Sequence, residues 1–408
     1  MPFQCPAWPP DWPEIETAAL AAINSGQWGQ YHSTLTQSLQ KRLASELPCA
    51  AVRLCCSGTA ALELALRCCQ IGPGDEVILA AYDFPGNFRT VELLGAKPVL
   101  VDVAQFKSGA LDKGERTVPG GHDDNVDEAM ISPTLCHEQL SAAAGEQVRA
   151  VVASHLHGSF AEIAHLRQIC DQHGWTLIED ACQAIGGRLQ NQSAGSFGHL
   201  ATLSFGGSKL VSAGSGGAIL ANDTRLAARL GGLLDRPGDT FPLAPLQAAV
   251  IGPQLDQLDQ WTCHRIRVAQ FLRQTVFPTL QGWVPLCDPN IHVQGEVHDP
   301  PSAGRLMKGT DSSSNGDLNA YYKFAWLVPS ERRDEVIAAG LNLGLPLGAG
   351  FRSMSRCSSR RCRKPVRTPR ADLLGERLIV MDHRALLIPA ERFDELAQAL
   401  RELHRITH

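Results

Sequence analysis

Residues 176–183 read TLIEDACQ, a short apolar run that ends on two carboxylates, Glu179 and Asp180. Such a run predicts a buried β-strand, and in open α/β sheets ligands bind outside the carboxyl ends of the strands. Asp180 can therefore hold a protonated ring nitrogen through a charge-assisted hydrogen bond, and Gln183 can reach the same ligand. The alternative, in which Asp180 only caps the following helix, has equal weight on these residues alone.

Strands and helices alternate on both sides of this run, which is typical of βαβ units and a mainly parallel sheet. The predicted strands cover residues 51–55, 76–79, 97–101, 149–154 and 176–180, and the predicted helices cover 15–24, 34–47, 60–69, 88–94 and 161–173. After a helix over 255–277, strands near 321–328 and 378–381 and helices near 331–341 and 391–404 predict a smaller α+β domain. We therefore expect an α/β fold in which helices flank a mainly parallel central sheet.

This order of elements divides the chain into three parts. Residues 1–30 form an N-terminal segment that we expect to pack near the small domain, residues 31–254 form the large domain, and residues 255–408 form the small C-terminal domain. Residues 105–130 are a polar interruption of the large domain. The stretch 288–317 contains GTDSSSNGD and several prolines, and it predicts a long mobile loop.

The overall composition excludes several classes of protein. The 408 residues carry a formal net charge of −5, whereas nucleic-acid binders have a basic excess. No run of about 18 apolar residues predicts a membrane span, and the N-terminus lacks the pattern of a secretory signal. Thirteen scattered cysteines match neither a disulfide framework nor a zinc motif, which indicates a reducing, cytoplasmic compartment. His155 and His157 share one strand face without a third ligand, so we expect no metal site there.

The stretch CSGTA, residues 56–60, joins a predicted strand to a helix that opens at Ala60. Backbone N–H groups at a helix N-terminus bind phosphate. Gly58 allows close approach of a ligand, and the Thr59 hydroxyl adds a donor. The plainer alternative is an ordinary helix cap, where Ser and Thr are common, and these residues alone favour it.

A glycine-rich region covers SFGHLATLSFGGSK at 196–209 and AGSGG at 213–217. An apolar strand leads to Ser204, and a loop between glycines then places Lys209. Lysines in inward-facing turns lose their proton readily and form Schiff bases with carbonyl compounds. The alternative is a lysine on a solvated loop, which an isolated Ser-Lys pair would favour.

Together, these three regions resemble the fold-type I pyridoxal-phosphate enzymes, and specifically the DegT/DnrJ/EryC1/StrS aminotransferase family. The similarity runs from about Ile15 to Asp259 and continues more weakly to the C-terminus. The matching phrases include SGTAALELAL (57–66), IGPGDEVILA (71–80), EDACQAIGG (179–187), GSGGAIL (214–220) and YYKFAWLV (321–328). The resemblance implies that the large domain binds pyridoxal 5'-phosphate and that the protein is a homodimer with active sites at the subunit interface.

The resemblance assigns the chemical roles to three residues. Lys209 would form a Schiff base with the pyridoxal phosphate and shuttle a proton. Asp180 would pair with the pyridine nitrogen and keep it protonated, so that the ring withdraws electrons. Gln183 would contact the ring face or the phenolic oxygen.

It also assigns residues to the phosphate and to the walls of the site. Thr59, Ala60 and Ser204 would contact the phosphate through amides and hydroxyls. Phe84 falls where the family places an aromatic ring that stacks on the pyridine, although plain core packing is the alternative. His155 matches the usual histidine of its loop and would line the active site.

Two stretches are less easily assigned. Family members carry an aromatic–Asn–aromatic–Arg stretch whose Asn reaches the phosphate of the neighbouring subunit, but here Thr240 stands at the Asn position and Pro242 at the Arg position. The loss of the Arg casts doubt on the usual substrate contacts. The basic stretch 356–370, and more weakly Arg352, suits a phosphate or carboxylate partner, whereas a solvated basic loop is the favoured alternative.

The leading hypothesis is therefore a transaminase that uses glutamate or glutamine as donor. Its acceptor would be a keto sugar that is linked to a nucleotide, or a related cyclitol ketone. Related sugar dehydratases share the fold but replace the lysine with His, so Lys209 argues against dehydration. A non-catalytic regulator that retains the fold is the third hypothesis, because the stretch 239–247 is altered.

Overall fold

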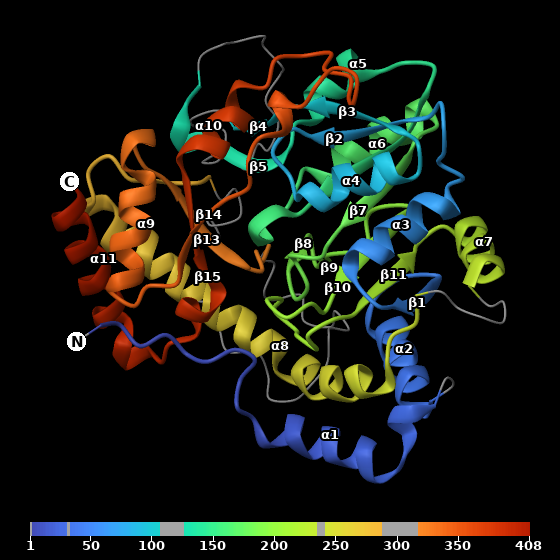
Figure 1. Ribbon diagram of the computed structural model, residues 1–408, viewed down its shortest axis with the longest axis horizontal. Coiled ribbons are helices and arrows are strands. Elements are labelled where there is room, and N and C mark those ends of the chain that lie inside the picture. The colour runs from blue at the N-terminus through green and yellow to red at the C-terminus, as the bar shows by residue number, and fades with distance from the viewer. Residues whose placement is uncertain (1, 31–32, 107–125, 235–240, 288–316) are drawn as a thin grey trace.

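Seven short apolar strands form the central sheet, in the order β1-β11-β10-β7-β6-β2-β3. A computed structural model describes residues 2–30, 33–106, 126–234, 241–287 and 317–408 (Figure 1). The strands are β1 (Ala51–Cys55), β2 (Glu76–Ala80), β3 (Lys97–Val101), β6 (Val148–Ser154), β7 (Thr176–Asp180), β10 (Leu200–Ser204) and β11 (Gly217–Ala221). Only β11 runs against the others, because it pairs antiparallel with both β1 and β10. The expected α/β fold with a mainly parallel sheet is confirmed.

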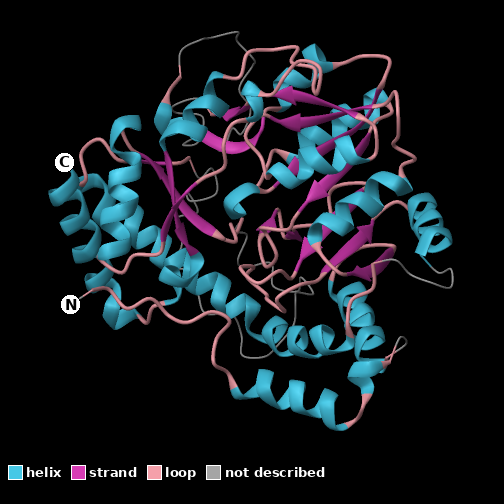
Figure 2. Ribbon diagram, in the orientation of Figure 1, coloured by secondary structure: helices cyan, strands magenta, loops and turns pink. Residues whose placement is uncertain are grey.

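Helices pack around this sheet and bury their apolar faces on it (Figure 2). They are α2 (Thr34–Glu46), α3 (Gly58–Cys68), α4 (Pro85–Leu93), α5 (Leu140–Ala143), α6 (Ile163–His173) and α7 (Thr224–Leu234). Two small ribbons accompany them, β4 (Val103–Gln105) with β5 (Ile131–Leu135), and β8 (Arg188–Leu189) with β9 (Gln192–Ser193). Helix α3 begins at Gly58 rather than at Ala60, because Ser57 caps it by accepting a hydrogen bond from the Ala60 N–H (3.0 Å).

A second sheet has its own core at the other side of the molecule (Figure 1). Its antiparallel strands lie in the order β12 (Val284–Pro285), β13 (Lys323–Leu327), β15 (Leu378–Asp382) and β14 (Leu347–Ala349). Helices α9 (Arg333–Asn342) and α11 (Phe393–Thr407) belong to the same unit. Phe3 lies in this second core, and its N–H donates to the Leu343 carbonyl (2.7 Å). The expected loop 288–317 falls almost entirely outside the described residues.

One long helix passes through both cores. Helix α8 runs from Pro245 to Phe271, so it begins ten residues before the predicted start at Leu255 and crosses the predicted domain boundary. Its first half contributes Ile251 to the first core, and its second half contributes Val268 to the second. Helix α1 (Pro13–Asn24) packs against it.

Pro253 lies inside α8, two residues before the predicted start. Proline has no N–H to donate within a helix and normally ends or kinks one. Here the Gln254 side-chain amide donates to the neighbouring Val250 carbonyl (2.7 Å) and to the Ser212 carbonyl (2.7 Å). These bonds, together with burial on both cores, keep the helix continuous.

The basic stretch 356–370 is a structural strap rather than an open anion site. Arg361 pairs with Glu92 of α4, and Arg363 pairs with Glu76 of β2 at 2.7 Å. The backbone of Arg363 also extends the sheet, because its N–H donates to Pro98 and its carbonyl accepts from Leu100, both at 2.9 Å. Three of the seven cationic side chains of this stretch, Arg361, Arg363 and Arg370, therefore pair with carboxylates of the large domain.

The strap leads into helix α10 (Pro369–Arg377), whose N-terminus is held by Asp102. Asp102 is fully buried; its carboxylate accepts from the Ala371 N–H (2.8 Å) and from the Arg370 Nε (3.0 Å). A carboxylate at a helix N-terminus also interacts favourably with the helix dipole.

No helix within the described ranges is both long and apolar enough to cross a lipid bilayer.

We expect Asp102→Ala to lower the free energy of unfolding by about 3–5 kcal/mol, because it leaves the partly buried Arg370 guanidinium without its counter-charge. Urea unfolding followed by circular dichroism measures the change. Glu63→Ala, which removes a helix-surface pair with Arg67, is the control and should cost less than about 1 kcal/mol. Equal effects of the two substitutions would contradict the role given to Asp102.

Candidate active site

The predicted site residues follow strands that end at the same edge of the central sheet. Strands β1, β2, β6, β7 and β10 all run in one direction, so their carboxyl ends lie together. The residues that follow or end these strands include Gly58, Phe84, His155, Asp180, Ser204 and Lys209. Such an edge is where α/β sheets bind ligands.

Asp180 is a buried carboxylate surrounded by neutral donors. Oδ2 accepts from Asn87 Nδ2 (2.9 Å) and Ser154 Oγ (3.3 Å), and Oδ1 accepts from the Cys182 N–H (3.1 Å) and Thr202 Oγ1 (3.2 Å). Among the described residues, no Lys or Arg forms an ion pair with it. A buried charge without a counter-charge is costly. Asp180 is therefore suited to a cationic group of a ligand.

A second acid, Asp83, lies beside Asp180 and behaves differently. Burial and the neighbouring Asp180 carboxylate raise the pKa of Asp83 to about 7. Asn87 spans the two, because its Nδ2 also lies 3.3 Å from Asp83 Oδ2. Asp83 therefore keeps its proton at pH values where a free aspartate would lose it, as expected for an acid buried beside a second carboxylate.

Lys209 lies in the loop after β10, where the second domain meets the first. Its Nζ lies 4.8 Å from the centroid of the Tyr322 ring, and Lys323 Nζ lies 4.6 Å from the same ring. Lys323 is paired with Asp382, whereas no carboxylate of the described residues pairs with Lys209. The Tyr322 hydroxyl lies 3.0 Å from Ser208 Oγ. The aromatic ring thus holds an otherwise unpaired amine.

The Cys182 side chain lies within the field of both predicted catalytic groups. Burial and the Asp180 carboxylate raise the pKa of the Cys182 thiol, while the positive charge of Lys209 lowers it. Both charges therefore act on one buried sulfur atom. Asp180 ends β7 and Lys209 lies in the loop after the neighbouring strand β10, so both residues lie at the same edge of the sheet.

The N-terminus of α3 closes another side of this edge. Ser57 accepts the Ala60 N–H, so the N–H groups of Gly58 and Thr59 have no acceptor within the helix. A Cβ at Gly58 would lie 2.8 Å from the Ser204 Cβ, which is too close, so the helix can approach Ser204 only with glycine here. This end of the helix offers N–H groups and a partial positive charge to an anion.

Phe84 and Gln183 occupy different environments. Phe84 is 38% exposed, and its ring meets Phe351 edge-on at 5.8 Å. A partly open ring at the strand edge leaves a face available for stacking. Gln183 is buried, and its Oε1 accepts from the His157 N–H (2.8 Å), so only its amide nitrogen remains for a ligand.

The structure contradicts the prediction for His155. Its Nε2 lies 2.8 Å from Glu179 Oε1, its Nδ1 accepts from the Ala161 N–H (3.1 Å), and its side chain has no exposure. Both ring nitrogens are therefore used by the protein. Glu179 precedes Asp180 in a strand and points to the opposite face of the sheet, which explains why its partner His155 does not serve the ligand.

Sequence reasoning missed three residues that shape the site. Asn87, in the first turn of α4, orients the two acids, although only its position soon after β2 could have suggested this. Tyr82 accepts a hydrogen bond from the Phe351 N–H (3.1 Å), and its hydroxyl oxygen also lies 3.2 Å from His157 Nε2. Burial and the positive charges of Lys323 and Lys209 lower the pKa of His157 to about 3, so the ring is neutral.

The network around His157 leaves one polar group buried without a partner. Nε2 is paired with the Tyr82 hydroxyl, whereas the buried Nδ1 makes no hydrogen bond with the described residues. The sequence signal for His157 is the phrase HLHG at 155–158, in which the family resemblance assigns the active-site role to His155 instead. Of the altered family stretch, Thr240 lies outside the described residues and Pro242 is exposed. Arg352 is exposed and forms no ion pair with the described part of the chain.

Known proteins give an independent comparison. Residues 11–113 and 125–298 match the model of the DegT/DnrJ/EryC1/StrS aminotransferase family. An L-glutamine:2-deoxy-scyllo-inosose aminotransferase of Streptomyces fradiae is 30% identical over 375 aligned residues, covering 85% of this chain and 76% of that protein. A UDP-N-acetyl-3-dehydro-alpha-D-glucosamine 3-aminotransferase of Acidithiobacillus ferrooxidans is 36% identical over 226 residues, covering 53% and 54%. The crystal structure of 3-amino-5-hydroxybenzoic acid synthase shares the fold, with a TM-score of 0.76 at 23% identity over 100% of both chains.

The raised pKa of Asp83 makes stability depend on pH. In the unfolded chain this acid loses its proton near pH 4, whereas in the folded protein it does so at about pH 7. The folded state therefore gains from the bound proton below pH 4 and loses this gain as the pH rises to 7. We expect Asp83→Asn to remove that loss, so that its stability relative to the wild type rises by on the order of 2–4 kcal/mol between pH 4 and pH 8.

Denaturant unfolding of ligand-free protein at the two pH values measures this difference. Asp334→Asn is the control, because the Asp334 side chain is 86% exposed, and it should show no such rise. A constant difference between Asp83→Asn and the wild type across the range would contradict the raised pKa.

Proposed function

The chain belongs to the DegT/DnrJ/EryC1/StrS aminotransferase family, and we propose that it moves an amino group from glutamate or glutamine to the ketone of a keto sugar, nucleotide-linked, or of a related cyclitol. As a member of that family it is an aminotransferase that uses pyridoxal phosphate. The relatives whose names mention a cyclitol and a nucleotide sugar support the two acceptor classes. The observation that carries the proposal is that Asp180, a buried carboxylate at the end of β7, and Lys209, an amine in the loop after the neighbouring strand β10, both lack an oppositely charged partner among the described residues.

The residues at the strand edge fit this cofactor. Pyridoxal phosphate supplies an aldehyde that bonds to amines and a ring that withdraws electrons when its nitrogen is protonated. Asp180 would hold that proton on the ring nitrogen, because it is a buried carboxylate that lacks a cationic partner among the described residues. Asn87, Ser154 and Thr202 would keep the carboxylate oriented toward the ring.

Lys209 would hold the cofactor through its Nζ and would carry the proton between substrate and cofactor. An amine without a carboxylate partner is easier to deprotonate than one in an ion pair, and only a deprotonated amine is a nucleophile. The Tyr322 ring lies 4.8 Å from this amine and positions it without forming an ion pair. The second domain thus contributes directly to the orientation of the reacting group.

The phosphate would lie at the N-terminus of α3, where Gly58 and Thr59 offer N–H groups and Ser204 a hydroxyl. Phe84 would stack on the ring, and the amide nitrogen of Gln183 would contact its phenolic oxygen. Arg352, an exposed cation directly after Phe351, would suit a carboxylate or phosphate of a substrate. These assignments explain why the residues from four strand ends meet here.

Lys209→Ala should abolish transamination and the visible absorption band of protein-bound pyridoxal phosphate, because no other group would bond to the aldehyde. Absorption spectra with added cofactor, and amino-group transfer assays, measure the two effects. Lys97→Ala, which alters an exposed lysine at the start of β3, should retain both. A band that persists in Lys209→Ala would show that this residue is not the attachment point.

The donor and acceptor can be identified in separate half-reactions. Glutamine or glutamate alone should bleach the visible band, and a keto-sugar nucleotide or a cyclitol ketone should restore it. A regulator need not turn over, so a band that no donor bleaches would favour that alternative. Formation of a keto sugar without amine transfer would favour a dehydratase.

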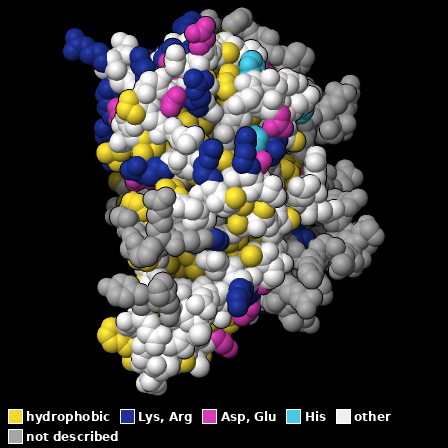
Figure 3. All heavy atoms as spheres, turned by 90° about the vertical axis from the view of Figure 1, so that its right-hand side faces the viewer, with side chains coloured by type: hydrophobic (Ala, Val, Ile, Leu, Met, Phe, Trp, Pro, Cys, Tyr) yellow, Lys and Arg dark blue, Asp and Glu magenta, His cyan; other side chains and the backbone are white. Residues whose placement is uncertain are grey.

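We also propose that two copies of the chain form a dimer. Figure 3 shows hydrophobic side chains at the surface in the middle and lower parts of one face. Large apolar side chains that are open to solvent include Trp28, at 57% exposure, and Leu246, at 37%. Exposed apolar surface favours association.

The thirteen cysteines are all free, which supports a reducing, cytoplasmic compartment.

Light scattering coupled to gel filtration should give twice the chain mass of 44.0 kDa. Trp28→Glu should shift the protein toward the monomer, because it places a charge in an apolar contact. Leu341→Glu, on α9 of the second domain, is the control. A wild-type protein that elutes as a monomer at all concentrations would contradict the dimer.

A further inference from the structure

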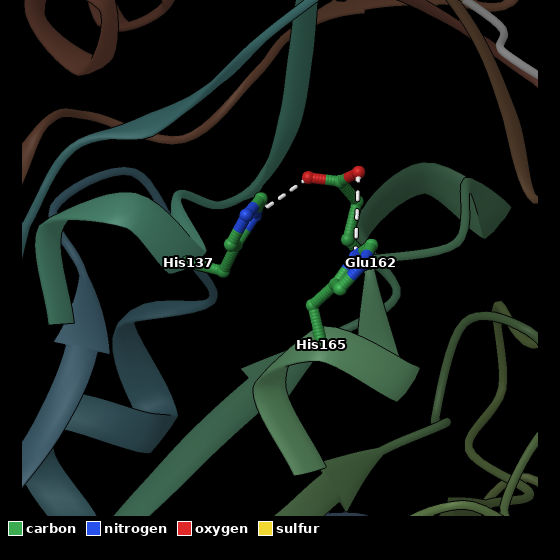
Figure 4. A group of neighbouring side chains, drawn as sticks. All are labelled: His137, Glu162 and His165. Atoms are coloured by element: carbon green, nitrogen blue, oxygen red, sulfur yellow. Dashed lines mark ion pairs between the residues drawn. The ribbon is translucent and has the colours of Figure 1, made fainter. Parts of the chain in front are cut away.

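A compact group of metal-ligating side chains lies outside the residues assigned to the cofactor. His137 follows β5, Glu162 directly precedes α6, and His165 lies in the first turn of α6 (Figure 4). One possible ligand atom from each residue can be chosen so that all three lie within 4.8 Å of one another. The two imidazole rings are nearly parallel, with centroids 5.1 Å apart and an interplanar angle of 20°. Both rings thus face the same carboxylate.

The hydrogen bonds of this group leave one buried oxygen unexplained. Glu162 Oε2 lies 2.6 Å from His137 Nδ1, which satisfies that oxygen. Glu162 Oε1 is buried and has no hydrogen-bond partner, and its nearest cationic group, His165 Nδ1, is 3.9 Å away. The Glu162 side chain is only 10% exposed, so bulk water does not readily compensate. A simple His137–Glu162 ion pair therefore explains the position of Oε2 but leaves Oε1 without a partner.

We propose that His137, Glu162 and His165 form a binding site for Zn²⁺, with water as a fourth ligand. Two imidazoles and one carboxylate are a ligand set that zinc accepts, and an open fourth position is common when three protein ligands are present. His165 is 41% exposed, which gives water access to that position. The ion would bind the oxygen that the protein leaves unpaired.

The spacing requires only small shifts of the side chains. Zinc bonds of 2.0–2.1 Å in a tetrahedron place neighbouring ligand atoms about 3.3 Å apart. Glu162 Oε1 and His165 Nδ1 would move closer from 3.9 Å, and His137 Nδ1 would turn to the ion and give up its 2.6 Å contact with Glu162 Oε2. Rotation of the exposed His165 ring can provide most of this change.

A bound ion would join two elements that lie on either side of a loop of the active site. His137 begins the short turn His137–Gln139, whereas Glu162 and His165 begin helix α6. The chain between β6 and α6 carries His157, which contacts Tyr82 and Gln183. Zinc would therefore fix the entry of α6 and hold this loop. The site itself does not depend on the proposed substrates.

Isothermal titration of the metal-free holoenzyme with Zn²⁺ tests the proposal. We expect one Zn²⁺ per chain and a rise in the melting temperature with zinc, because a ligand that binds only the folded state stabilises it. Glu162→Gln keeps the shape of the side chain, and His165→Gln alters an exposed one, so both variants should fold. Each should bind zinc at least about tenfold more weakly and lose most of the thermal shift.

His173→Gln is the matched control, because His173 is an exposed histidine at the other end of α6. It should bind zinc as the wild type does. Absence of zinc binding by the wild type would overturn the proposal. Zinc binding that is unchanged in both Glu162→Gln and His165→Gln would also overturn it, since the ion would then lie elsewhere.

Discussion

The end of strand β7 places two carboxylates on opposite faces of the central sheet, because successive residues of a strand alternate. Glu179 points to one side, where it accepts from His155 and from the N–H groups of Gly195, Phe197 and Gly198. It thereby fixes the loop that leads into β10. Asp180 points to the other side and remains without a cationic partner among the described residues. One acid of this pair stabilises the framework, and the other is the one that we propose for the cofactor.

The two domains meet at the side chain of Lys209, the amine that we propose as the reacting group. Strand β13 begins at Lys323, directly after Tyr322, so the Tyr322 ring stands between the lysines of the two domains. Trp8 of the N-terminal segment donates to the Lys209 carbonyl (3.0 Å), which ties a third part of the chain to the same loop. Three distant segments thus determine where one side chain lies, and a pattern of local residues does not reveal this.

Local patterns were sufficient where the chemistry follows from a strand and the turn after it. The apolar run before Asp180 and the glycine-flanked loop of Lys209 gave both residues their correct place at the sheet edge. The local patterns failed for residues whose hydrogen-bond partners are distant in the sequence. His155 resembled a ligand residue, but its partner Glu179 is known only once strands β6 and β7 pair. Asn87 was missed for the same reason, and the predicted start of α8 lies after Pro253, a residue type that usually ends a helix.

The strap at residues 356–370 has a consequence for the behaviour of the protein in a crowded solution. Strand β3 is the last strand at one side of the central sheet, and an uncovered outer strand is a template on which other chains can add and aggregate. The backbone of Arg363 occupies hydrogen-bonding groups of Pro98 and Leu100 on that outer strand. The flanking arginines place bulky, hydrated charges beside it. The chain thus supplies its own protection against self-association into extended β-structure.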